Sequence, residues 1–202
     1  MRAIAVIARA SSPPLALASA VWDGAITNEG SLYGVSIGVS GGVSPYTYRL
    51  KIGGSIVASA SDAGTTKYIF VAASRTWNAQ SVSVEVTDAA SVTVSSASLG
   101  VLTVRWIDFG GGVSVSSYAP TVGQITSMTM TVSASPAPSS YAWEYRYKPA
   151  GGAWGSWISF GWSGALVYSG TYSGVGDQYQ YRCTATNVAG SRQDTSSTVT
   201  VT

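Results

Sequence analysis

The sequence contains no histidine, one cysteine and only 9 acidic residues among 202. The missing histidine excludes the usual general base, the histidine-containing catalytic triads and every histidine metal site. A lone Cys183 cannot form an internal disulfide bond or a thiolate zinc site, and no phosphate-binding loop of the G-x-x-x-x-G-K type occurs. We therefore expect no catalytic residues, no cofactor and no metal site.

Charge is also scarce, because charged residues make up 10% of the chain and the formal net charge is +2. Nucleic-acid binding needs a dense basic patch, so we expect no nucleic-acid partner. No apolar run approaches the roughly 18 residues that span a bilayer, so we expect no membrane insertion. What is abundant is hydrophobic residues at 46%, with 12 Tyr, 7 Trp and 23 Gly, a composition that excludes a disordered chain.

From Ala20 onward the hydrophobic residues recur with a period of two. Val82, Val84 and Val86 alternate with polar residues, and Gly, Ser, Pro and Asn interrupt the pattern at short intervals. Many short strands at even spacing predict an all-β fold built as an antiparallel sandwich or barrel. Two tandem units, each of the size of a β-sandwich, fit the pattern after an extended N-terminal arm. The expected parts are the arm at 1–20, the first sandwich at 21–104 and the second at 105–202. Strands of the first sandwich are predicted at 31–40, 46–52, 55–60, 67–73, 80–87 and 91–104.

The first twenty residues read M-R-A-I-A-V-I-A-R-A-S-S-P-P-L-A-L-A-S-A. Arg2, a short apolar stretch and Ala18-Ser19-Ala20 supply weak versions of the three parts of a secretory signal. Arg9 and the block Ser11-Ser12-Pro13-Pro14 interrupt the apolar stretch early, which favours an uncleaved arm that lies against a partner. A cleaved signal peptide is the alternative.

The run from Asp177 to Gly190, D-Q-Y-Q-Y-R-C-T-A-T-N-V-A-G, together with an upstream tryptophan, resembles the intermediate-type immunoglobulin-like domain. The resemblance implies that Trp143 is the buried core tryptophan and that the Tyr181 hydroxyl ties a corner to nearby backbone. Where the family has a second cysteine this sequence has Met130, so the family's disulfide bond is absent. The resemblance thus implies a structural core of Met130, Trp143, Tyr181 and Cys183.

The first half carries a second, less complete resemblance. Gly41-Gly42, Pro45-Tyr46-Thr47-Tyr48 and the alternating run that ends at Asp88 are similar to polycystic-kidney-disease-like and related bacterial immunoglobulin-like repeats. The W-D-F-G-D-G core of that family is missing, so the resemblance implies only a sandwich. Cysteine-poor sandwiches of these families occur on bacterial surface proteins and tailed-phage virions, as decoration, spacer or adhesion modules.

Aromatic residues gather in the glycine-rich segment 154–172. Exposed rings there could stack on a glycan or anchor an interface between subunits, and the alternative is that they fill the core. On one regular strand, two rings three residues apart point to opposite faces, so we expect one of the first two tryptophans to be exposed or to lie in an interface. Because charged side chains are dispersed, we expect aromatic contacts to dominate binding. The candidates are Trp154, Trp157, Trp162, Tyr168 and Tyr172.

Together these features predict a non-enzymatic structural protein of a tailed-bacteriophage virion, as a capsid decoration or other exterior protein. The arm would bind a major capsid or tail protein, and the chain would assemble in the reducing host cytoplasm, which a disulfide-free fold permits. One alternative is a secreted or surface-attached bacterial adhesion or carbohydrate-binding module, and another is a phage tail tube or fibre accessory protein. A homo-oligomer and a host-surface glycan are further expected partners.

Overall fold

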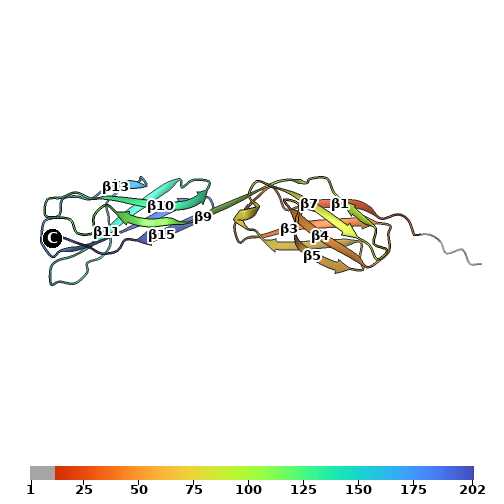
Figure 1. The fold of residues 1–202 in the computed structure, drawn as a ribbon, viewed down its shortest axis with the longest axis horizontal. Helices are drawn as coiled ribbons and strands as arrows, with labels where there is room; N and C mark the ends of the chain where they lie inside the picture. The colour runs from red at the N-terminus through yellow and green to blue at the C-terminus, as the bar shows by residue number, and fades with distance from the viewer. Residues whose placement is uncertain (1–11) are drawn as a thin grey trace, which may run out of the picture. The chain divides into compact units, whose positions relative to one another are not determined.

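The computed structural model describes residues 12–202, which form antiparallel β-sheets and no α-helix (Figure 1). The chain divides into two compact units, the first ending at Val104 and the second running from Arg105 to Thr202. Each unit has its own buried apolar cluster. The all-β class predicted from the period-two pattern is confirmed.

The first unit packs a three-stranded sheet against a larger one. Its strands are β1 (Ala16–Trp22), β2 (Ile26–Asn28), β3 (Leu32–Ser40), β4 (Tyr46–Ile52), β5 (Ser55–Asp62), β6 (Thr66–Ala72), β7 (Gln80–Thr87), β8 (Thr93–Ser95) and the start of β9 (Gly100–Val115), with one 3-10 helix, η1 (Arg75–Trp77). One sheet has the order β1-β3-β6. In the other, β9, β7, β4 and β5 are neighbours in that order, β8 pairs with β7 and β2 pairs with β9.

The core of the first unit follows from strict alternation along β4 and β7. Tyr48 and Leu50 of β4 are fully buried, as are Val82, Val84 and Val86 of β7. The residues between them are only partly buried because a pleated strand points successive side chains to opposite faces. The strands predicted at 46–52 and 80–87 are therefore confirmed with their expected bounds.

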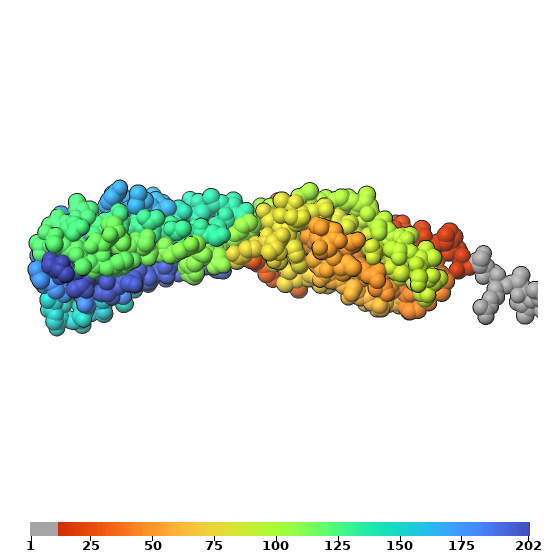
Figure 2. Space-filling model, viewed as in Figure 1, coloured from red at the N-terminus to blue at the C-terminus, as the bar shows by residue number. Residues whose placement is uncertain are grey.

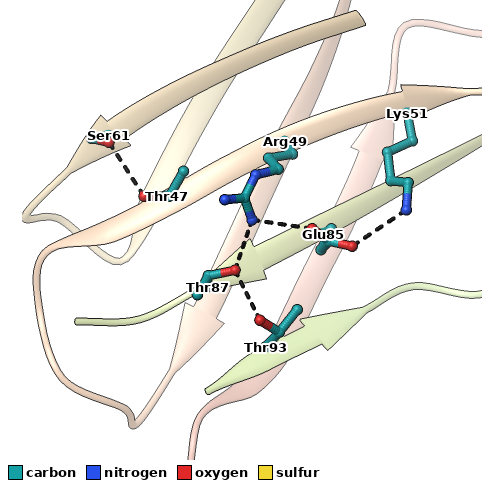
Figure 3. A network of polar contacts seen from close by, with 7 residues as sticks. All are labelled: Thr47, Arg49, Lys51, Ser61, Glu85, Thr87 and Thr93. Carbon is teal, nitrogen blue, oxygen red and sulfur yellow. Dashed lines mark hydrogen bonds and ion pairs between the residues drawn. The ribbon is translucent and has the colours of Figure 1, made fainter. Parts of the chain in front are cut away.

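The solvent face of the same sheet carries a network of polar contacts (Figure 3). Arg49 Nη1 lies 3.1 Å from Glu85 Oε1, and Lys51 Nζ lies 3.3 Å from Glu85 Oε2. Arg49 also donates to Thr87 Oγ1 at 2.7 Å, and Thr87 shares a 2.9 Å hydrogen bond with Thr93. Partly exposed pairs of this kind contribute about 0–1 kcal/mol each. These two basic side chains are therefore engaged by their own sheet rather than forming an open basic patch.

Asp88 closes the turn that follows β7. Its Oδ1 accepts hydrogen bonds from the Ala90 and Val92 amides, and its Oδ2 accepts one from the Val43 amide, each at 2.9 Å. The carboxylate is buried, and three charge-assisted bonds satisfy backbone groups that would otherwise lack partners. Asp88 thereby fixes the β3–β4 connection against the β7–β8 turn.

The expected N-terminal arm at 1–20 needs correction, because its later part belongs to the first sandwich. Residues 1–11 lie outside the described part of the chain. From Ala16 the chain forms β1, which pairs antiparallel with β3, and Leu15 is already part of the buried core. Alanine and serine are small enough for the exposed side of an edge strand, so this strand lacks the strong polar alternation on which the prediction depended. The sandwich therefore begins near Leu15 rather than at residue 21.

The chain just before Leu15 lies against the turn formed by Gly41 and Gly42. The Gly42 amide donates to the Pro13 carbonyl at 2.7 Å. Gly41 has a φ of +67°, and a Cβ at this position would collide with the Pro14 carbonyl. Both the backbone conformation and the close approach therefore require glycine at position 41.

The second unit contains the remainder of β9 and the strands β10 (Ser127–Ser135), β11 (Ser140–Lys148), β12 (Ile158–Ser159), β13 (Leu166–Tyr168), β14 (Gln178–Asn187), β15 (Gly190–Thr195) and β16 (Val199–Thr200). One of its sheets has the order β13-β10-β9, and the other has the order β12-β11-β14-β15, with β16 paired to β14.

β9 pairs with β7 through residues 100–102 and with β10 through residues 106–115. The strand predicted at 91–104 is therefore wrong in its extent. The amides of Ser96 and Leu99 bond to β7 carbonyls outside a regular ladder, which separates β8 from β9.

Candidate functional site

Strands β11 and β14 give the second unit two chemically different faces. They pair antiparallel, with Trp143 opposite Cys183 and Glu144 opposite Arg182. Successive side chains along both strands point to opposite faces, so Trp143 and Cys183 point into the core. Glu144 and Arg182 lie on the other face and are partly exposed. The inward face carries mainly aromatic rings, whereas the outward face carries the charged side chains.

The four residues expected to form the core of this unit all lie in one buried cluster: Met130, Trp143, Tyr181 and Cys183. Trp143 Nε1 donates a 2.8 Å hydrogen bond to the Gly164 carbonyl, which gives its polar atom a partner. Met130 and Cys183 are both in this cluster, so apolar packing takes the place that a disulfide bond has in the similar family.

Tyr181 differs from the corner residue that the resemblance implied. Its hydroxyl shares a 2.8 Å hydrogen bond with the Tyr172 hydroxyl, which in turn lies 2.7 Å from Thr126 Oγ1. Burial raises the pKa of Tyr181 above its ordinary value, so the hydroxyl stays protonated. Tyr172 also departs from its expected role as a surface contact, because it is only 2% exposed and its hydroxyl satisfies this buried chain.

Cys183 is fully buried, and this burial raises its pKa from 9.0 to about 12. We expect Cys183→Ala to lower the free energy of unfolding by about 1–2 kcal/mol through lost packing. A pKa raised on folding means that the thiol's contribution is complete below pH 9.0 and is lost as the pH rises toward about 12. Urea denaturation across this range should show a steeper loss of stability in the wild type than in Cys183→Ala. Fast alkylation of the native thiol at neutral pH would contradict this account.

A cavity of about 440 Å³ lies beside tyrosines of β11 and β14, among them Tyr145 and Tyr181. Trp162 and Tyr168 are 51% and 54% exposed, so their rings form its accessible wall. Deeper in the unit, Phe160 meets Tyr145 edge-on with ring centroids 5.7 Å apart. We call this feature the aromatic cleft, defined by Tyr145, Phe160, Trp162, Tyr168, Thr171 and Tyr179 as its main lining. Tyr172 and Tyr181 also border it.

Trp154 and Trp157 pack on the outward face of β11 and β14. The Arg146 guanidinium lies 4.8 Å from the Trp154 ring centroid and 4.9 Å from that of Trp157, and the Arg182 guanidinium lies 4.3 Å from Trp157. Arg182 also forms two hydrogen bonds with Glu144, which lower the pKa of that carboxyl. Each cation–π contact contributes about 0.5–1 kcal/mol at an exposed site.

The expectation that these two tryptophans point to opposite faces is therefore wrong. It assumed one regular strand, but the chain enters β12 only after Trp157. Both rings are partly buried against Arg146, which leaves neither as a freely exposed anchor. They hold the 150–157 segment on the sheet rather than forming part of the aromatic cleft.

Asp177 holds the start of the 150–157 segment through hydrogen bonds. Its Oδ2 accepts a 3.0 Å hydrogen bond from the Tyr147 hydroxyl, and its Oδ1 accepts one from the Ala150 amide at 3.0 Å. Burial, together with this carboxylate, raises the pKa of Tyr147. The segment from about residue 150 to 170, cyan to light blue in Figure 2, lies at the surface of the second unit. Although it contains little regular strand, its start is thus held by side-chain contacts.

Sequence reasoning missed an exposed aromatic pair on the first unit. The rings of Tyr68 and Phe70 stack with centroids 4.9 Å apart and an interplanar angle of 23°, and both are about half exposed. Phe70 lies over Gly34, where an added Cβ would come within 2.8 Å of the ring. The signal was the run from Tyr68 to Val71, in which every residue is apolar or aromatic, so hydrophobic side chains point to both faces of the strand. Since Ile69 is buried, its aromatic neighbours must face solvent.

No set of three or more His, Cys, Asp or Glu side chains within residues 12–202 is arranged to hold a metal ion. In the same part of the chain, no helix has the length and apolar character to cross a membrane. The aromatic cleft combines ring faces with hydroxyl groups, which suits it to binding.

No protein-family model and no curated protein matches this sequence. Among solved structures, the first eight immunoglobulin domains of the Down syndrome cell adhesion molecule are similar, with a TM-score of 0.50 and 14% identity, over 93% of this chain and 24% of that one. The mouse nectin-like molecule 4 ectodomain is similar with a TM-score of 0.48 and 14% identity, over 95% of this chain and 64% of that one. This chain therefore spans less than two thirds of the length of that ectodomain. Three N-terminal domains of the bacteriophage RB49 highly immunogenic outer capsid protein have a TM-score of 0.36 and 13% identity, over 93% of this chain and 59% of that one. The first of these similarities, together with the antiparallel sheets, establishes the fold alone, which is an all-β protein of immunoglobulin-like sandwiches.

Proposed function

We propose that this chain is a non-enzymatic exterior protein of a tailed-phage virion, in which immunoglobulin-like sandwiches supply structure and contact surface. The observation that carries the proposal is the disulfide-free core around Trp143, where Met130 stands in place of the second cysteine. Such a core folds without an oxidising compartment, and this suits a protein assembled in the reducing cytoplasm of a host cell.

The charge distribution supports a structural role in protein contacts. Arg49 and Lys51 share Glu85 on the first unit, while Arg146 and Arg182 are covered by tryptophan rings on the second. These contacts engage four basic side chains of the described residues within the protein, so those four do not form an open basic patch for nucleic acid. The proposal assigns the contact with a major capsid or tail protein to the residues before Leu15, because from Leu15 onward the chain belongs to a sandwich core.

A second candidate is a secreted or surface-attached bacterial adhesion module, and the aromatic cleft is the observation that favours it. Trp162 and Tyr168 present about half of their area to solvent, although burying such rings is strongly favourable. Exposed rings that line a cavity are a common feature of sites that bind a ligand or partner.

Purified particles separate the two candidates. Gradient-purified virions should contain the chain in a fixed ratio to the major capsid protein by quantitative mass spectrometry, and separated heads and tails should show which part carries it. Absence from particles, combined with the presence of the chain on uninfected bacteria, would overturn the virion proposal in favour of the adhesion module.

A further inference from the structure

The lining of the aromatic cleft contains no charged residue. Aromatic residues predominate there, together with Ser169, Gly170 and Thr171. Moving a charged ligand out of water into such a site has a large unfavourable free energy, because no opposite charge compensates for lost hydration. The cleft therefore selects for a neutral ligand.

The same lining also disfavours a purely apolar ligand. Within residues 12–202, the hydroxyls of Tyr145, Tyr168 and Thr171 form no hydrogen bond with other protein groups. A hydrocarbon that covered them would leave these polar atoms without water or any other partner, which is unfavourable. The ligand should therefore carry hydroxyl groups of its own at its edge.

The ring faces define the remaining requirement. Trp162 and Tyr168 expose flat surfaces with negative charge density above the ring, which attract weakly positive C–H groups. A pyranose ring has such C–H groups on its faces and hydroxyls around its edge. A volume of about 440 Å³ lies within the range of small-molecule sites, about 300–1,000 Å³.

We propose that the aromatic cleft binds the pyranose ring of a neutral saccharide, with Trp162 and Tyr168 stacking on it and the free hydroxyls of Tyr145 and Thr171 bonding to its edge. This inference deepens the proposed function and rests on it, since it gives the exterior protein a neutral glycan as its partner. Neither Trp154 nor Trp157 takes part, because both rings are engaged with Arg146 on the opposite face of β11.

The test uses the full chain with neutral probes: methyl glucoside, methyl galactoside, methyl mannoside, maltose and cellobiose. Saturation-transfer NMR and tryptophan fluorescence titration should detect binding of at least one of these probes, and sorbitol, which has no ring face, should not bind. Trp162→Ala and Tyr168→Ala should each weaken binding by about tenfold or more. Trp154→Ala is the matched control, because it removes a ring of the same unit outside the cleft, and its affinity should equal that of the wild type.

A second pair of variants tests the cleft without removing a ring. A Cβ added at Gly170 meets no atom within 4 Å, and the backbone there is not left-handed, so the position tolerates a side chain. Gly170→Leu adds bulk to the wall and should weaken saccharide binding, whereas Gly170→Ala should leave it nearly unchanged. Thermal unfolding of both variants shows whether the fold is intact.

Absence of binding for every neutral probe, or equal binding by wild type and Trp162→Ala, would overturn the saccharide proposal. Equal binding of methyl glucoside and its anionic uronic-acid counterpart would overturn the selection for neutral ligands. These outcomes leave the virion proposal standing if the chain is still found in purified particles. Conversely, saccharide binding by a chain absent from particles would overturn the virion proposal alone.

Discussion

Trp143→Ala is expected to lower the free energy of unfolding of the second unit by about 3–5 kcal/mol. Trp143 is the largest fully buried side chain of this unit and lies among Met130, Cys183 and Tyr181 in its core. Its loss leaves a cavity in a close-packed interior and also frees the Gly164 carbonyl, which accepts the Nε1 hydrogen bond. Without a disulfide bond to restrict the unfolded chain, packing at this position must supply more of the stability.

Urea denaturation monitored by hydrogen exchange reports the stability of each unit separately. Exchange should accelerate in β10, β11 and β14, while β4 and β7 of the first unit keep their protection. Trp162→Ala is the matched control because it removes an exposed tryptophan from the same unit, and it should change stability by less than about 1 kcal/mol. Similar stabilities for the two variants would show that Trp143 is not the centre of this core.

Removal of residues 1–20 is expected to destabilise the first unit by about 3 kcal/mol or more. The truncation deletes Leu15, a core residue, and most of β1, whose partner β3 would lose one row of backbone hydrogen bonds. A buried leucine alone contributes about 1.5–3 kcal/mol. The exposed edge of β3 would also become available for pairing with another chain, so the truncated protein should aggregate more readily.

Removal of residues 1–11 is the control, because it keeps Leu15 and all of β1. This shorter truncation should leave the stability of the first unit close to that of the full chain. Hydrogen exchange of the β3 amides reports the difference directly, since these amides pair with both β1 and β6. Equal protection of β3 in the two truncations would mean that β1 contributes nothing to the sandwich.

Alternating strands were the part of the fold that the sequence could predict. β4 and β7 alternate strictly between buried apolar and partly exposed polar residues, and their bounds agree with the pattern. The pattern did not predict β1 because Ala16, Ala18 and Ser19 are small, so the exposed side of this strand has no clear polar alternation. Its place in the sandwich depends on pairing with β3, which is a contact distant in sequence.

The candidate site was predictable in residue type but not in arrangement. The density of rings between 154 and 172 indicated a contact region, yet nothing local assigned Trp154 and Trp157 to the arginine face or Trp162 and Tyr168 to the cleft. That division depends on the path of a segment with little regular strand. Only the course of its first part is visible in specific contacts, which come from residues distant in sequence: Arg146 beneath both tryptophans and Asp177 bonded to the Ala150 amide.

The most direct test of the central claim, that this chain makes contact through uncharged aromatic surface, is its binding to bacterial cells as a function of salt. Fluorescently labelled wild type and Trp162→Ala should be titrated onto the cells at low and at physiological ionic strength. We predict that wild-type affinity changes little with salt and that Trp162→Ala weakens it by about tenfold or more, because a stacked ring is not screened by ions. An affinity that collapses with salt while Trp162→Ala binds like the wild type would contradict the account and direct attention to the basic face of Arg146, Lys148 and Arg182.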